Sequence, residues 1–137
     1  MSQALLTGLS RTTRPRSMVR RFLGLDALVT GANGVAYLVA AGPLGELFGV
    51  DRGLLSELGI VLVAYAAGVA WLAGRAEPAA GGVKAVVDIN LVWTAASLVA
   101  LVAWLEPTTV GAVWTVAQAG TVAGFAALQW GALRLTR

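Results

Sequence analysis

Four long apolar stretches dominate this 137-residue chain and restrict what it can fold into. They cover residues 22–41, 54–74, 83–105 and 109–133. A helix of about 20 residues is about 30 Å long, which matches the hydrocarbon core of a bilayer. Only helices and closed barrels satisfy backbone hydrogen bonds in lipid, and these stretches are too long for barrel strands. The sequence therefore predicts an all-α, four-helix transmembrane bundle in up-down-up-down order.

The composition supports this prediction. Hydrophobic residues make up 58% of the chain and charged residues only 12%, against about 25% charged residues in soluble domains. A soluble protein with this composition would have too few polar residues to cover its core. We therefore expect a multi-pass integral membrane protein.

The basic residues indicate an orientation. Nine of the ten lie on one side of the predicted bundle: Arg11, Arg14, Arg16, Arg20, Arg21, Arg75, Lys84, Arg134 and Arg137. Only Arg52 lies on the other side, where most of the acidic residues lie. Because Lys and Arg in short loops mark the cytoplasmic side, we expect both termini in the cytoplasm. The excess of Arg over Lys and the many Ala, Gly and Val residues indicate a GC-rich bacterium and hence its plasma (inner) membrane.

The chain divides into a cytoplasmic basic tail, residues 1–21, and a membrane domain, residues 22–137. Each arginine of the tail adds about 1 kcal/mol of attraction to anionic lipid headgroups. The expected partners are therefore the bilayer and these headgroups. A nucleic-acid partner is not expected, because the basic residues flank apolar helices instead of forming an exposed basic and aromatic face.

The two halves of the chain resemble each other. Arg21 precedes Asp26 as Lys84 precedes Asp88, and a Trp-x-x-x-Arg pattern ends each half. An internal repeat of a two-helix hairpin explains this likeness. The common need of membrane spans for basic residues and Trp at their ends explains it equally.

The chain has no Cys and no His, which removes thiol and imidazole chemistry and the usual zinc sites. We therefore expect no enzyme activity, no catalytic residues, no metal site and no cofactor.

Two carboxylates lie inside predicted spans, where charge is costly and often functional. Asp26 and Asp88 are expected at one depth, near the basic side of the membrane. One interpretation makes them a pair that binds a proton or cation. The other makes them structural partners of nearby bases, Lys84 for Asp88, and Arg21, Arg75 or Arg134 for Asp26.

Several amides belong to polar stripes on the predicted helices. Asn33 and Gln118 are expected near mid-membrane, where they could meet. One stripe comprises Trp114, Gln118, Thr121, Phe125 and Gln129, and the other comprises Asn90, Thr94, Ser97 and Trp104. Such stripes either line an amphipathic cavity or bond helices to one another.

Small residues suggest where helices approach closely. Gly120 and Gly124 form a G-x-x-x-G motif, and Gly31 follows Ala27 at the same spacing. The motif serves packing within the bundle or a homo-oligomer, and the sequence leaves both open.

The stretch Thr30–Tyr37, which follows Leu25-Asp26-Ala27, resembles small four-span membrane proteins of GC-rich bacteria. The resemblance implies a fold and a location and no particular activity. Two functions remain open. The first is a non-catalytic structural, accessory or interaction component of the membrane. The alternative is a small transporter or binding protein for a lipophilic or cationic compound, using Asp26, Asp88 and Asn33.

Overall fold

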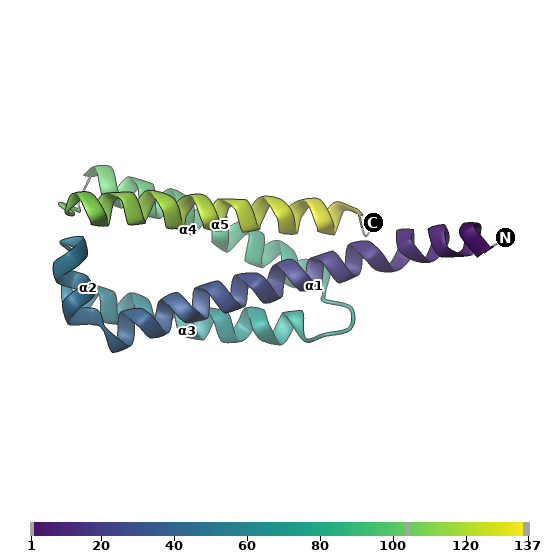
Figure 1. Ribbon diagram of the computed structural model, residues 1–137, viewed down its shortest axis with the longest axis horizontal. Coiled ribbons are helices and arrows are strands. Elements are labelled where there is room, and N and C mark those ends of the chain that lie inside the picture. The colour runs from purple at the N-terminus through teal and green to yellow at the C-terminus, as the bar shows by residue number, and fades with distance from the viewer. Residues whose placement is uncertain (1, 104, 136–137) are drawn as a thin grey trace.

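The computed structural model describes the backbone of residues 2–103 and 105–135, and the side chains from residue 17 onward within these ranges. The described part is all-helical, as predicted (Figure 1). Its helices are α1 (Ser2–Val39), α2 (Ala41–Phe48), α3 (Arg52–Ala73), α4 (Ala80–Ala103) and α5 (Thr109–Leu135). Trp104 and Arg137, which entered the predictions above, lie outside the described residues.

Four helical segments are long and apolar enough to cross a membrane: Ser17–Val39 of α1, and the whole of α3, α4 and α5. Their outward faces carry large apolar side chains, such as Leu28, which is 68% exposed, and Val102, which is 87% exposed. An apolar outer surface suits contact with lipid chains, since the bilayer core offers no water to polar groups.

Two predicted boundaries differ from the structure. The basic tail is continuous with the first span, because α1 begins at Ser2 and extends beyond the other helices (Figure 1). Residues 42–46 lie between the first two predicted spans, and the structure places them in the short helix α2. Pro43 lies in the first turn of α2, where a missing N–H costs no helical hydrogen bond. Gly49 then ends this helix with a φ of 69°.

The long helices form two pairs, α1 with α3 and α4 with α5. In the first pair the backbones approach closely at Gly34 and Gly59, where a Cβ added to Gly59 would lie 2.9 Å from the Gly34 carbonyl oxygen. Gly31 also faces α3, because a Cβ added to Gly31 would lie 3.4 Å from the Cβ of Ala66. Gly120 and Gly124 face open space instead. Packing between α1 and α3 therefore uses glycines that the G-x-x-x-G pattern did not identify.

The two pairs meet at both ends of the bundle. At the end that carries Arg20 and Lys84, called the basic end, buried apolar residues form one cluster: Val19, Leu23, Ala27, Val69, Leu72, Val83, Val86, Ala132 and Leu133. At the opposite end, called the Thr108 end, Thr108 donates a hydrogen bond of 2.6 Å to the Leu47 carbonyl. There Phe48 stacks on Trp114 with ring centroids 5.6 Å apart.

A short turn joins the end of α3 at Ala73 to the start of α4 at Ala80. The structure brings them together near this turn, where Leu72 faces Gly82, but α3 packs chiefly on α1 and α4 packs chiefly on α5. The two pairs contact each other chiefly through α1 and α5.

Candidate functional site

A buried carboxylate joins the two helix pairs near the basic end. Asp26 on α1 is 1% exposed. Its Oδ1 accepts a hydrogen bond of 3.0 Å from the Thr30 hydroxyl, one turn further along α1. Its Oδ2 accepts bonds of 2.8 Å from the carboxamide nitrogens of Asn90 on α4 and Gln129 on α5. Three helices therefore supply this one acid and its hydrogen-bond donors.

The fourth long helix joins the same network through Tyr65 on α3. Its hydroxyl donates a hydrogen bond of 3.1 Å to Asn90 Oδ1, and Asn90 Nδ2 donates a second bond of 3.1 Å to Gln129 Oε1. Asp26, Thr30, Tyr65, Asn90 and Gln129 are called the Asp26 cluster. Since all four long helices contribute to it, the cluster fixes how the two pairs are placed against each other.

The hydrogen-bond partners of Asp26 within the described residues are all neutral, whereas the structural interpretation of the sequence gave it an arginine partner. Asp88 lies on the exposed face of α4, as does Lys84. The structure therefore brings Asp26 and Asn90 together and leaves Asp88 outside the cluster. The two carboxylates do not share an enclosed site.

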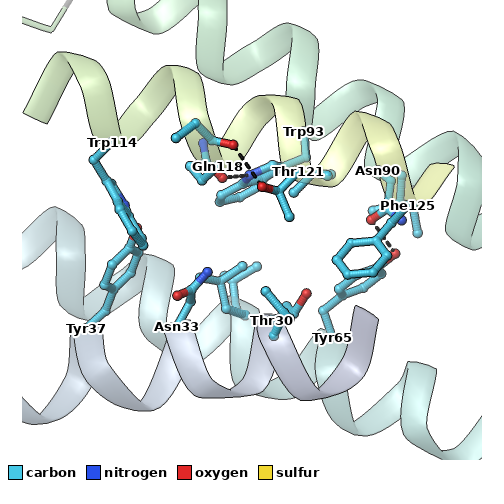
Figure 2. Close-up of a pocket in the computed structure, with 16 residues that line it drawn as sticks. Thr30, Asn33, Tyr37, Tyr65, Asn90, Trp93, Trp114, Gln118, Thr121 and Phe125 are labelled. Atoms are coloured by element: carbon cyan, nitrogen blue, oxygen red, sulfur yellow. Dashed lines mark hydrogen bonds between the residues drawn. The ribbon is translucent and has the colours of Figure 1, made fainter. Parts of the chain in front are cut away.

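A cavity of about 230 Å³ lies next to the Asp26 cluster, between the two helix pairs (Figure 2). It is called the inner cavity. Tyr37 and Trp114 lie at one end of it, and Tyr65, Asn90 and Phe125 lie at the other (Figure 2). Its lining is Val29, Thr30, Asn33, Tyr37, Val61, Leu62, Tyr65, Ile89, Asn90, Trp93, Trp114, Ala117, Gln118, Thr121, Val122 and Phe125.

The two mid-membrane amides of the sequence prediction both line the inner cavity, but their bonding differs. Gln118 Oε1 accepts a hydrogen bond of 2.9 Å from the Trp93 indole, and its Nε2 donates one of 3.2 Å to Ser97. Asn33 is half-buried, points into the cavity and has no side-chain hydrogen-bond partner among the described residues (Figure 2). Gln118 therefore bonds to α4 and not to Asn33, which leaves the Asn33 carboxamide available.

Among the described residues, the lining of the inner cavity is aromatic, aliphatic and neutral-polar, with no Asp, Glu, Lys or Arg. A dry apolar cavity of about 150 Å³ is large enough to hold benzene. A cavity of about 230 Å³ therefore holds a small ring or a branched group, and the Asn33 carboxamide can donate to it or accept from it.

Part of this site follows from the polar stripe on the fourth predicted span. Trp114, Gln118, Thr121 and Phe125 line the inner cavity, and Gln129 enters the Asp26 cluster. From the other stripe, Asn90 lines the cavity and Thr94 donates to its carbonyl oxygen.

The roles of Tyr37 and Tyr65 were not foreseen. Tyr37 accepts a hydrogen bond of 2.7 Å from the Trp114 indole, and Tyr65 donates to Asn90. A tyrosine in a span belongs equally well to a membrane interface or a core, so sequence spacing gave no signal for either contact.

Comparisons with protein-family models, with curated proteins and with solved structures found no match for this chain. The function of the chain is therefore inferred from the geometry of the Asp26 cluster and of the inner cavity.

Proposed function

We propose that this protein is a multi-pass membrane protein that binds a small, uncharged, lipophilic molecule in its inner cavity. The sequence analysis gave a transporter or binding protein for a lipophilic or cationic compound as its alternative. The present proposal keeps binding, restricts the ligand to a neutral compound, and assigns its recognition to Asn33. Asp26 holds the cavity wall in place, and Asp88 takes no part.

One observation carries this proposal. The inner cavity is lined by all four long helices and contains a carboxamide, that of Asn33, without a hydrogen-bond partner among the described residues. A polar group in an apolar environment is costly unless it is bonded, and membrane-embedded amides normally bond to another helix. A ligand with one hydrogen-bonding group completes this site.

The charge of the lining argues for a neutral ligand. Asp26 is not part of the lining of the inner cavity. It accepts hydrogen bonds from Thr30 and Asn90, which do line the cavity, and is itself 1% exposed. An ion moved into an apolar site without a counter-charge is strongly disfavoured. The attraction between a cation and an aromatic face is weaker than the free energy that the cation loses when it leaves water.

The proposal includes a location and a topology. The distribution of Lys and Arg favours a bacterial plasma membrane, an up-down-up-down order and cytoplasmic termini. It includes no catalytic step, because the described lining offers no nucleophile and base in contact with each other. A reporter fused after the C-terminus tests the orientation, since it must be active on the cytoplasmic side only.

Binding is measured by quenching of tryptophan fluorescence, because Trp93 and Trp114 line the cavity. The probe is 4-bromobenzyl alcohol, and 4-bromobenzyltrimethylammonium is the cation of matched shape. We expect saturable quenching of the protein in lipid nanodiscs by the alcohol. Thr121→Phe fills the cavity and should weaken binding by about tenfold or more, equivalent to about 1.4 kcal/mol.

Val116→Phe is the matched control, since Val116 lies on the same helix, is 53% exposed and does not line the cavity. Asn33→Leu should weaken alcohol binding by about tenfold, as expected for one lost hydrogen bond. Quenching that stays linear in probe concentration and equal in Thr121→Phe contradicts a binding site and supports the structural or accessory role. Tighter binding of the ammonium probe contradicts the neutral class.

A further inference from the structure

A second cavity continues from the inner one toward the Thr108 end. It has a volume of about 230 Å³ and is called the outer cavity. Its lining includes Leu54 and Leu58 on α3, and Ala96 and Ala100 on α4. We propose that the two cavities together hold one amphiphilic, lipid-like molecule, with its polar group at Asn33 and its hydrocarbon chain in the outer cavity. This inference rests on the proposed function and specifies its ligand class.

The two cavities are adjacent because they share four lining residues: Tyr37, Trp93, Trp114 and Gln118. These side chains are bonded in two pairs, Trp114 to Tyr37 at 2.7 Å and Trp93 to Gln118 at 2.9 Å. Each shared polar atom thus has its partner within the protein. A hydrocarbon chain can pass beside these side chains without leaving a buried polar group unbonded.

The polarity of the lining changes from one cavity to the other. The inner cavity contains Asn33, which has no side-chain partner in the part of the chain that the structure describes, whereas the polar side chains of the outer cavity are already bonded. Thr115 donates to the Gly111 carbonyl at 2.8 Å, and Ser97 accepts from Gln118. The remaining outer lining is mainly Leu, Val, Ala and aromatic side chains, which suits a saturated chain.

The outer cavity is partly open at the surface of the bundle. Ala96 on α4 is the exposed member of its lining, and Leu54 and Leu58 on α3 are half-buried on the facing wall. α3 packs chiefly on α1 and α4 packs chiefly on α5, so these two walls are not closed against each other. A molecule dissolved in the bilayer therefore reaches the outer cavity sideways.

The test uses two photoreactive probes in nanodiscs, a benzyl alcohol carrying a diazirine on its ring and 1-decanol carrying a diazirine at the end of its chain. Labelled residues are mapped by mass spectrometry. We expect the ring probe to label the inner cavity, and the decanol probe to label α3 and α4 around Leu58 and Ala100. Ala100→Phe should lower decanol labelling there by about tenfold, because it fills the outer cavity.

Val102→Phe is the matched control, because Val102 is 87% exposed on the same helix and outside the cavity lining. Retained labelling by the ring probe shows that Ala100→Phe has kept its fold. If decanol labelling is confined to the inner cavity, or is unchanged in Ala100→Phe, the hydrocarbon chain does not occupy the outer cavity. The proposed binding function of the inner cavity is not affected by that result. If neither probe labels the cavity residues more strongly than it labels the lipid-facing residues, both proposals fail.

Discussion

The Asp26 cluster and the inner cavity are adjacent parts of the same interface between helix pairs, yet their polar groups are used in opposite ways. In the cluster, Asp26 accepts from three donors, and its members are at most partly exposed. In the cavity, Asn33 has no partner among the described residues and faces empty volume. The first arrangement stabilises the bundle, whereas the second leaves a polar group for a ligand.

A charged residue within a membrane span therefore need not be the residue that binds a ligand. Asp26 attracts attention in the sequence because charge in lipid is costly. Its donors satisfy it completely, so it acts on a ligand only by positioning Thr30 and Asn90, which line the cavity. Variants of the two regions should therefore affect different measurements.

The largest effect on stability is expected for Asp26→Leu. The change leaves the donors of Thr30, Asn90 and Gln129 without their common acceptor and should lower the free energy of unfolding by about 2 kcal/mol. Asp26→Asn keeps one acceptor and should fall between Leu and the wild type. Unfolding in mixed micelles, followed by circular dichroism, measures both. Equal stability of all three proteins would mean that the cluster does not hold the helix pairs together.

The two glutamines of α5 give a matched pair of variants. Gln129 is 0% exposed and bonds to Asp26 and Asn90, whereas Gln118 lines both cavities. Gln129→Met should lower the free energy of unfolding by about 1 kcal/mol and leave probe binding nearly unchanged. Gln118→Met also removes two hydrogen bonds and should cost about as much, but it should alter probe binding more. A larger effect of Gln129→Met than of Gln118→Met on probe binding would contradict the division between the two regions.

A smaller effect is expected for Tyr37→Phe, which removes the acceptor of the Trp114 indole at one end of the inner cavity. One membrane-embedded hydrogen bond contributes about 0.6 kcal/mol on average. We expect a stability loss of that size and a shift of tryptophan emission, because the Trp114 N–H loses its partner. Unchanged emission in both the free and the probe-bound protein would show that this bond does not form.

The smallest effects are expected on the outward surface. Asp88 is exposed, so Asp88→Asn should change neither the free energy of unfolding nor probe binding. Gly120 faces open space within α5, so Gly120→Ala should leave probe binding unchanged and should not lower the free energy of unfolding, because Ala suits a helix better than Gly. Both are measured in the same assays as the variants above. Loss of binding in Asp88→Asn would restore the carboxylate-pair hypothesis, and loss of stability in Gly120→Ala would point to a homo-oligomer through α5.

Much of the fold follows from hydropathy alone. The four long apolar helices were predicted close to their observed bounds, because a lipid environment imposes one length and one periodicity on every span. The prediction was wrong in the segment between two spans, where the length and periodicity of a membrane-spanning helix do not apply. Residues 42–46 form a helix although they contain Gly42, Pro43 and Gly45, because Pro43 lies in a first turn.

The candidate site was only partly predictable. The stripe from Trp114 to Phe125 identified one wall of the inner cavity, because helical spacing places those residues on one face. The closeness of Asn90 and Gln129 to Asp26 could not be predicted, because it depends on which helices pair. Gly34 and Gly59, which bring α1 and α3 together, have no distinguishing signal in a chain with 17 glycines.

The amino-acid sequence is enough to predict that the chain is helical, that four segments suit a membrane, and which residues carry polar groups within them. Those properties depend on local composition and on the bilayer as solvent. Only the tertiary structure decided that Asp26 is bonded by neutral donors, that Asp88 is exposed and that Asn33 faces a cavity. The physical reason is that these outcomes depend on how helices pair and rotate, which hydropathy along one helix does not encode.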